Sequence, residues 1–240
     1  MTVTAAIQVN QILTRVGVEV GLAEVTDPFG SQLQHYIQMK YLLQTCGEEL
    51  CLAFPWEFLV RTLEITTDGT DEYDLPADFQ SMIDQTGWDL TNEFPVRGPL
   101  TAQEFELLKA TQTLATNVFG YRIMGGKLVV YPTPPAGFDL TFEYQSRSFV
   151  RTDAVPAVYQ PSFTAGSDYI LFDRTLITRY LKCKWLEAKG FDNSAALMTF
   201  NQTFEFLTGK DKGGAILNAG RSRGFPYLGY RNIPETGYGQ

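Results

Sequence analysis

Residues 120–144 read GYRIMGGKLVVYPTPPAGFDLTFEY, and this stretch decides the fold class of the chain. Two short runs rich in β-forming residues flank Gly125-Gly126, a pair that suits the tight turn of a two-residue hairpin. After a Pro-rich break, apolar residues alternate strictly with polar ones at Phe138, Leu140, Phe142 and Tyr144. A period of two is typical of a strand with one buried face, so the stretch predicts a hairpin followed by a further strand.

The β pattern extends upstream of the hairpin. FLVRTLEITT alternates, an Asp-Gly pair follows as a turn signal, and EYDLP resumes an extended segment. Thr101 and Glu104 have the spacing of a capping box, which predicts a short helix over residues 101–110. Together these signals predict a compact, mostly antiparallel β module over residues 57–150.

Helical periodicity precedes this module. Apolar residues recur at helical spacing at Ala6, Val9, Leu13 and Val16. This first helix is expected to end at Gly17. A longer stripe predicts a second helix from Ser31 to Phe54, about six turns long, which Pro55 stops. Asp27-Pro28 or Ser31 provides its start signal.

Helical periodicity returns after a Pro-containing loop. One apolar stripe runs through Ile170, Ile177, Leu181, Trp185 and Ala188. Gly190 is placed to end that helix and Asp192 to cap the next one. The second stripe consists of Leu197, Phe200, Phe204 and Leu207, and Gly209 is placed to close it. The two segments predict an antiparallel helical hairpin.

We therefore expect an α+β fold. A helical bundle, made of the N-terminal helices and the C-terminal helical hairpin, carries an inserted β module that is mostly antiparallel, and an extended C-terminal arm. The expected boundaries are 1–56 for the N-terminal helices, 57–150 for the β module, 151–212 for the linker and helical hairpin, and 213–240 for the arm.

The arm differs in composition from the rest of the chain. Residues 213–240 hold seven glycines and two prolines and show no helical or strand period. They also hold arginines and aromatic rings at Arg221, Arg223, Phe225, Tyr227, Tyr230, Arg231 and Tyr238. A disordered tail is normally poorer in aromatic residues, so we expect an extended arm that orders on a partner surface. A loose tail with incidental aromatic residues is the alternative.

Composition excludes several classes of protein. The 240 residues carry a formal net charge of −8, which argues against a nucleic-acid binder held by a general positive field. No apolar run reaches the roughly 18 residues of a membrane span, and the N-terminus lacks the pattern of a secretory signal. Three cysteines and the single histidine, His35, show no zinc-site spacing. We expect no metal or other cofactor, and buried, inert thiols in a reducing compartment.

The charge is segregated along the chain. Between Phe58 and Ala110 three basic residues face eleven acidic ones, a net of −8. From Arg174 to Arg231 ten basic residues face four acidic ones, a net of +6. This polarity favours a subunit that lies between two partners or stacks against its own copies, although two ordinary solvated faces would give the same pattern.

No catalytic motif stands out. The chain has neither a GxxxxGKS/T nor a GxSxG motif, and a Ser-His-Asp triad would need His35, which lies within a predicted helix. Carboxylate pairs at glycosidase separations could come from Glu64, Asp74, Asp78 and Asp84. Because eleven acids lie in this one segment, such a pair is expected by chance, and we expect no enzyme.

Two elements of the sequence carry a resemblance. A long helix ends in the Pro-Trp of AFPWEFL, and a Y-x-LP-x-DF element follows at Tyr73, Leu75, Pro76, Asp78 and Phe79. GPLTAQEFELLKA comes next, and then a GG-x-L-x-x-YP-x-P element at Gly125, Gly126, Leu128, Tyr131, Pro132 and Pro134. In this order, over about residues 1–212, these pieces resemble the head-to-tail adaptor proteins of short-tailed bacteriophages (podoviruses).

The resemblance implies a structural role in the virion, after assembly in the host cytoplasm. Such adaptors form a ring, usually of twelve copies, that docks on the portal protein, extends the DNA channel and offers a platform to tail nozzle or fibre proteins. The helical part packs side by side around the ring, which makes Arg174, Lys182 and Lys189 candidate subunit-interface residues. The C-terminal extension reaches the portal, and the candidate portal-binding residues are Arg221, Arg223, Phe225, Tyr227, Tyr230 and Arg231.

The resemblance also gives the acidic segment a role. Genomic DNA passes through such a channel without specific binding, and a negative or neutral wall avoids the counterion-release attraction of a basic one. Asp71, Asp74, Asp78 and Asp84 are therefore candidate channel- or tail-facing acids. Two alternatives stay open: a tail-associated cell-wall hydrolase that uses a carboxylate pair, and another ring-forming tail component such as a terminator or nozzle subunit.

Overall fold

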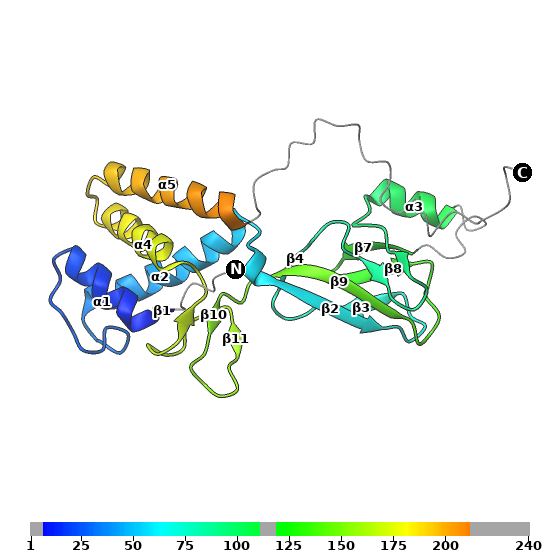
Figure 1. Cartoon of the computed structure of the whole chain (residues 1–240), viewed down its shortest axis with the longest axis horizontal. Coiled ribbons are helices and arrows are strands. Elements are labelled where there is room, and N and C mark those ends of the chain that lie inside the picture. The colour runs from blue at the N-terminus through cyan, green and yellow to red at the C-terminus, as the bar shows by residue number, and fades with distance from the viewer. Residues whose placement is uncertain (1–6, 111–118, 212–240) are drawn as a thin grey trace, which may run out of the picture.

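The chain folds into two lobes joined by a narrow connection (Figure 1). The computed structural model describes residues 7–110 and 119–211. One end of the molecule, the helical lobe, holds four helices and a small sheet, and the other end, the β lobe, holds two sheets and one helix. The fold is therefore of the expected α+β class, with antiparallel sheets. The predicted arm, residues 213–240, lies outside the described residues.

Four helices build the helical lobe: α1 (Val9–Glu19), α2 (Gln34–Ala53), α4 (Arg174–Ala188) and α5 (Ser194–Asp211). Helix α4 contacts each of the other three and so lies at the centre of the lobe. Ile12, Leu43 and Leu181, from three different helices, are fully buried in one core. Trp56 closes this core beside the connection to the β lobe and donates its indole N–H to the Leu50 carbonyl at 2.7 Å.

Helix α1 does not end at Gly17 as predicted but continues to Glu19. Gly17 is buried, and a Cβ at this position would lie 2.8 Å from the Tyr36 hydroxyl oxygen of α2. The glycine therefore allows close packing of two helices and does not act as a stop signal. The Tyr36 hydroxyl then donates to the Ala23 carbonyl at 2.7 Å, which holds the loop between the helices.

Helix α2 begins at Gln34, three residues after the predicted start at Ser31. Ser31 instead accepts a hydrogen bond from the Leu33 N–H on its Oγ at 3.3 Å, and so forms a turn before the helix. The predicted end is confirmed, because the helix stops at Ala53, just before Phe54 and Pro55. The residue before a proline is driven out of the helical region, which explains this stop.

The predicted helical hairpin is present as α4 and α5. Asp173 caps α4 by accepting from the Thr175 and Leu176 N–H groups at 2.7 and 3.2 Å. Gly190, at φ 71°, ends α4 as predicted: its N–H donates to Glu187 and that of Phe191 to Leu186, a Schellman arrangement. Asp192 accepts from the Ser194 N–H at 3.0 Å, as expected for the start of the next helix.

Two details of the hairpin prediction are wrong. Ile170 lies in a strand, because Asp173 sets the start of α4 three residues later. Helix α5 runs through Gly209 to Asp211, since Gly209 lacks the left-handed conformation of a helix-terminating glycine. A glycine without a left-handed conformation is tolerated in a helix and does not terminate it.

The helical lobe also contains a small antiparallel sheet that the sequence pattern did not predict. Its strands, in order, are β1 (Ile7–Gln8), β12 (Tyr169–Ile170), β10 (Val150–Arg151) and β11 (Tyr159–Gln160). Each strand has only two residues, which is too short to show a period of two, so these segments read as helix or loop in the sequence. The hairpin formed by β10 and β11 projects from the lobe (Figure 1).

The β lobe holds the predicted glycine-turn hairpin. Strands β7 (Gly120–Met124) and β8 (Lys127–Tyr131) pair in register across Gly125 and Gly126, whose φ values are 58° and 79°. Strand β3 (Glu72–Asp74) adds to β8 and completes this sheet. The predicted two-residue turn is therefore confirmed.

The second sheet of the β lobe is built on β9 (Asp139–Ser146). It pairs with β2 (Val60–Thr66), β4 (Phe79–Met82) and β5 (Trp88–Asp89), and β5 pairs in turn with β6 (Phe94–Pro95). Leu140, Phe142 and Tyr144 of β9 are buried, as the alternation predicted. Helix α3 (Ala102–Ala110) packs against β7 and β8 of the other sheet, and its capping box forms: the Thr101 Oγ1 accepts from the Glu104 N–H at 3.3 Å.

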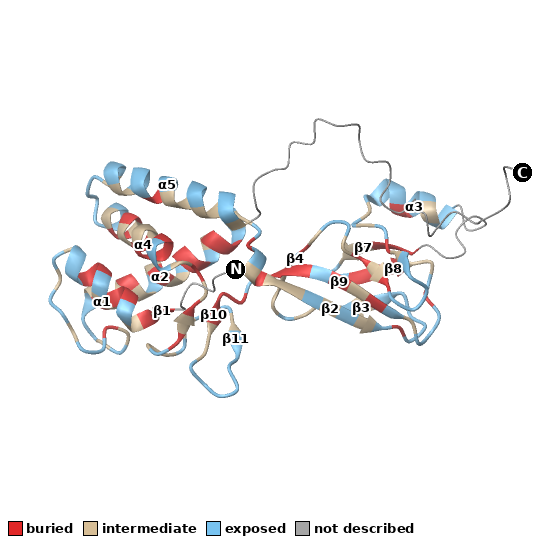
Figure 2. Ribbon diagram, viewed as in Figure 1, coloured by how far each residue is buried: buried red, intermediate tan, exposed pale blue. Residues whose placement is uncertain are grey.

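Each lobe has its own hydrophobic core (Figure 2). A few contacts join the lobes at the 3-10 turn η1 (Glu57–Leu59): Gln80 donates to the Cys51 carbonyl at 3.1 Å, and Gln145 donates to the Trp56 carbonyl at 3.1 Å. The Arg61 guanidinium lies 4.7 Å from the centre of the Tyr159 ring. None of the helices that the structure describes is long and apolar enough to cross a bilayer.

Candidate functional site

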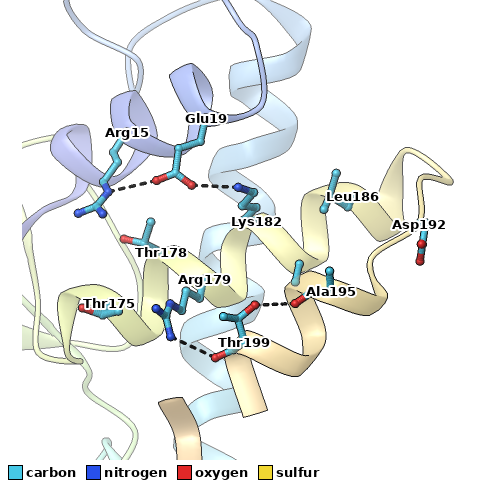
Figure 3. Close-up of a pocket in the computed structure, with 11 residues that line it drawn as sticks. Arg15, Glu19, Thr175, Thr178, Arg179, Lys182, Leu186, Asp192, Ala195 and Thr199 are labelled. Atoms are coloured by element: carbon cyan, nitrogen blue, oxygen red, sulfur yellow. Dashed lines mark hydrogen bonds and ion pairs between the residues drawn. The ribbon is translucent and has the colours of Figure 1, made fainter. Parts of the chain in front are cut away.

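A surface hollow in the helical lobe runs along the outer face of α4 (Figure 3). This hollow, here called the α1–α4 groove, lies between α1 and α4 and reaches the start of α5. Its volume is about 490 Å³. A second hollow of about 450 Å³, the α4–α5 groove, lies between the start of α4 and the end of α5. Thr175 and Arg179 line both, so the two grooves meet on one face of α4.

The sequence of α4 explains this face. Thr175, Arg179, Lys182 and Leu186 follow one another at intervals of three and four residues, so they share one side of the helix. The opposite side carries Ile177, Leu181 and Trp185, which are buried in the core. An amphipathic helix therefore presents a polar, cation-bearing stripe to the surface.

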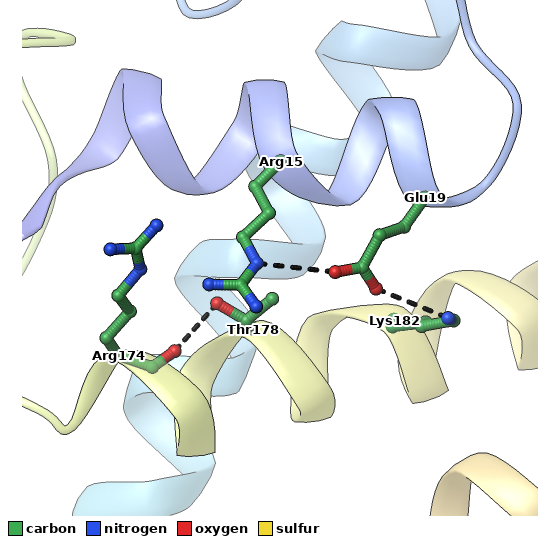
Figure 4. Close-up of polar contacts among 5 residues, drawn as sticks. All are labelled: Arg15, Glu19, Arg174, Thr178 and Lys182. Carbon is green, nitrogen blue, oxygen red and sulfur yellow. Dashed lines mark hydrogen bonds and ion pairs between the residues drawn. The ribbon is translucent and has the colours of Figure 1, made fainter.

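Two cations in the α1–α4 groove share one acid (Figure 4). The Arg15 Nε lies 3.3 Å from a Glu19 oxygen, and the Lys182 Nζ lies 3.2 Å from the other Glu19 oxygen. All three side chains are more than a third exposed, so these ion pairs contribute little to stability. They do keep both cations at the groove surface and tie α1 to α4.

Arg174 adds a further charge beside this cluster. It is exposed at the start of α4, and its side chain points toward the same side as Arg15 (Figure 4). Among the residues that the structure describes, no acid lies within ion-pair distance of it. Arg174 is therefore available to a partner, and the groove surface carries more positive than negative charge.

Arg179 links α4 to α5. Its Nη1 donates to the Thr199 carbonyl at 3.2 Å and to the Thr203 hydroxyl. These bonds hold the guanidinium where the two grooves meet. A guanidinium fixed in this way is pre-organised to receive a carboxylate.

The three predicted subunit-interface residues do not form one site. Lys182 lines the α1–α4 groove and Arg174 lies beside it, but Lys189 lies beyond the end of α4. Its Nζ donates to Gln38 Oε1 of α2 at 2.7 Å and lies 4.6 Å from the centre of the Trp185 ring. Lys189 therefore packs against its own chain.

Sequence reasoning missed Arg15 and Arg179. The i, i+4 spacing of Arg15 and Glu19 was a readable signal, because such pairs lie on one helix face. Arg179 lies on the same stripe as Lys182, three residues before it, and a full helical projection of α4 would have found it.

The four predicted acids lie at separate places on the β lobe. Asp71 precedes strand β3, and Asp74 is the last residue of β3, with its Oδ1 4.0 Å from the Lys127 Nζ. Asp84 follows β4, and all three of these acids are exposed. Asp78 is half-buried and accepts hydrogen bonds from the Tyr144 hydroxyl at 3.0 Å and the Ser146 hydroxyl at 2.5 Å. Asp78 thus holds the start of β4 against β9, whereas the other three side chains are exposed.

The predicted portal-binding residues lie outside the described part of the chain: Arg221, Arg223, Phe225, Tyr227, Tyr230 and Arg231. Within the described residues, no three His, Cys, Asp or Glu side chains come together as metal ligands would. Both grooves are in the helical lobe, away from Glu64, Asp74 and the other acids weighed as a hydrolase pair.

The thiols are buried, as expected. Burial raises the pKa of Cys51 to about 12 and also raises the pKa values of Cys46 and Cys183. At neutral pH these side chains are neutral thiols, which are poor nucleophiles and poor metal ligands.

The two lobes expose grooves, cations and acids on their surfaces. Surfaces with these groups are able to contact other polypeptides. The SU10 adaptor protein family model matches residues 8–216. The chain therefore belongs to the SU10 adaptor family of bacteriophage structural proteins.

Family membership confirms the resemblance to phage adaptors and carries general consequences. It makes the chain a structural component of the virion, in a family whose members interact with portal and tail components. A search of curated proteins found no match.

Proposed function

We propose that this protein is the head-to-tail adaptor that docks on the portal, extends the DNA channel and provides the platform for tail assembly, without catalysing a reaction. The observation that carries the proposal is the family match, because it spans residues 8–216 and so includes both lobes. A match confined to one lobe would be compatible with an unrelated protein that shares a domain.

In this proposal the two lobes have different neighbours. The helical lobe packs beside its copies in a ring, usually of twelve, with Arg174 available to the next subunit. The arm reaches the portal through Arg221, Arg223, Phe225, Tyr227, Tyr230 and Arg231. The β lobe then faces the tail nozzle or fibre proteins, and its exposed acids Asp71, Asp74 and Asp84 face the channel or the tail. The segregated charge of the sequence supports this two-sided role.

Native mass spectrometry of the full-length chain with its portal protein tests the proposal. We expect a ring of adaptor copies on the portal, with a fixed ratio of the two chains. Binding in no fixed ratio, or no binding, would contradict the portal role and favour another tail ring.

A truncation tests the arm separately. A chain that ends at Lys212 keeps all of the described residues and loses the arm. We expect weaker portal binding with unchanged circular dichroism. Portal binding as tight as that of the full chain would remove the six arm residues from the proposal while leaving the ring intact.

A further inference from the structure

The hairpin of β10 and β11 carries an exposed apolar tip. Residues 152–158, here called the finger, join the two strands, and all of those from Asp153 to Val158 are exposed. Val155 is 98% exposed and Val158 is 55% exposed. Among the finger's residues only Asp153 is charged. A protruding tip of this composition is unusual for a surface that meets only water, and is typical of a contact surface.

The finger is rigid enough to act as a docking element. The Thr152 N–H donates to the Val158 carbonyl at 2.9 Å, and the Val158 N–H donates to the Thr152 hydroxyl at 2.9 Å. These two bonds close the base of the loop. Pro156 further restricts the backbone of the tip. Less conformational entropy is therefore lost when the tip is buried against a partner.

The α4–α5 groove offers a surface of matching character. Phe206, on the outer side of α5, is 60% exposed, and Leu207 beside it is half-buried. Arg179 lies at the inner end of this groove, where its Nη1 is engaged with α5. Asp173 also lines the groove, but its carboxylate is taken up in capping α4. The groove therefore combines exposed apolar side chains with one guanidinium.

The finger and the groove lie on different sides of the same lobe. Helix α5 forms one edge of the helical lobe, and the β10–β11 hairpin projects from the opposite edge (Figure 1). A finger in this position cannot fill the groove of its own chain, but it can reach the groove of a neighbour. Two different surfaces that fit each other across copies make a heterologous contact, which closes into a ring when the rotation between copies allows.

We propose that the finger of one copy of this chain docks into the α4–α5 groove of a second copy. In this contact Val155 packs against Phe206 and Leu207. Asp153, the one charged residue of the finger, lies opposite Arg179. The inference rests on the proposed ring and names the surfaces through which its subunits meet.

Cross-linking between two different variants tests the contact directly. Full-length Ala154→Cys places a thiol on the finger, and full-length Gln202→Cys places one at an exposed position that lines the groove. The natural cysteines are buried with raised pKa values, so they compete poorly for oxidation. The two variants are mixed on the portal and oxidised. They should give disulfide-linked dimers in several-fold higher yield than a control mixture of Gln202→Cys with Leu90→Cys, whose site in the β lobe is also exposed.

Complementation tests the heterologous geometry. Val155→Asp places a charge in the apolar contact surface of the finger only, and Phe206→Asp does so in the groove only. Each variant alone should therefore fail to form rings. Mixed in equal amounts, they retain one intact finger and one intact groove between them and should form heterodimers that grow no further. This rescue also shows that both variants are folded. Leu90→Asp, an exposed control, should form rings as the unaltered chain does.

The outcomes separate this inference from the proposed function. If the unaltered chain forms rings and both Asp variants form them equally well, the finger contact is wrong while the ring stands. Cross-links no more abundant than in the control mixture would also show that the finger contact is wrong. If the unaltered chain forms no ring with its portal, the proposed function fails, and this inference fails with it.

Discussion

At the scale of single residues, a polar node between α2 and α4 fixes the centre of the helical lobe. The Tyr180 hydroxyl donates to a Glu49 oxygen, and the Lys184 Nζ lies 2.9 Å from the same carboxylate. The Tyr180 ring stacks on Phe200 of α5, with ring centres 4.3 Å apart. The Glu49 carboxylate thereby positions Tyr180, and the Tyr180 ring in turn packs against α5.

This node predicts a pH-dependent stability. Burial alone would raise the pKa of Glu49, but hydrogen bonds from Tyr180 and Lys184 and the Lys184 charge outweigh it and lower the pKa. A lowered folded-state pKa stabilises the fold above the unfolded carboxyl's pKa, and this contribution is lost as the pH falls through the folded value. Because the side chain is 39% exposed, solvent screening limits the contribution to about 0.5–1 kcal/mol.

Glu49→Gln should therefore lower the free energy of unfolding near pH 7 and have a smaller effect at pH 3. Urea titrations at the two pH values measure both. Glu48→Gln, one residue away and exposed, is the matched control and should change little at either pH. An equal loss for Glu49→Gln at pH 7 and pH 3 would show that the carboxylate charge contributes nothing.

Substitution by alanine is expected to change the stability of the fold in opposite directions at two helical glycines. A Cβ on Gly47 of α2 would lie 2.1 Å from a ring carbon of Phe149, which is fully buried, so Gly47→Ala should overpack the core and cost about 1–3 kcal/mol. At Gly209 of α5, no atom of the described residues beyond its chain neighbours and its own helix backbone lies within 4 Å of that position. Gly209→Ala should therefore stabilise the helix by about 0.5–1 kcal/mol. Thermal unfolding of the two variants should shift in opposite directions, and a shared direction would contradict the packing argument.

At the scale of elements, the sequence predicted the helices and strands that show a sustained hydrophobic period or are bounded by turn and capping residues. The β7–β8 hairpin, the α3 capping box and the α4–α5 hairpin all appear, because each is specified by residues close together in the chain. The two-residue strands β1, β10, β11 and β12 could not be predicted, because they exist only through pairing with distant segments. Gly17 and Gly209 show the same limit: whether a glycine stops a helix depends on its tertiary surroundings.

The candidate site was less predictable than the fold. The basic stripe of α4 could be found by its spacing, but the grooves beside it also need α1 and α5, which contribute Arg15 and Phe206 from far away in the sequence. Lys189 falls on a similar run of cations and yet contacts Gln38 of its own chain. Charge can be counted in a sequence, whereas the availability of each charge is decided by packing.

The start of α4 offers a prediction at this scale. The Asp173 side chain accepts two N–H groups of the first turn, so Asp173→Ala should cost about 0.5–2 kcal/mol of stability. Asp173→Asn keeps an acceptor at the cap and should recover most of this loss. Urea unfolding of both variants measures the difference, and equal losses would show that the cap acts through its charge rather than through these bonds.

At the scale of the whole molecule, the acidic segment and the basic stripe of the chain lie in different lobes. The segment with a net of −8, Phe58 to Ala110, falls within the β lobe, whereas the cation-bearing stripe of α4 belongs to the helical lobe. Few contacts cross the connection between the lobes, among them the hydrogen bonds of Gln80 and Gln145. Each lobe can therefore meet a different partner without rearranging the other.

The acidic surface of the β lobe gives the last prediction. Asp71, Asp74 and Asp84 are exposed, and Asp78 is excluded because it bonds to Tyr144 and Ser146. If the three exposed acids face the channel, changing all of them to Lys should let the assembled ring retain duplex DNA, because each new cation releases counterions from the phosphates. The retention should weaken steeply as salt is raised.

Filter binding of DNA to rings on their portal, at several salt concentrations, measures this effect. The triple Asp→Asn variant is the matched control: it removes the same negative charges without adding cations, so its rings should release DNA as the unaltered rings do. A triple Lys variant that binds no more DNA than the Asn variant would place these acids away from the DNA path. In that case the negative charge of the β lobe would be left to serve contacts with tail proteins, through the charge complementarity that guides protein association.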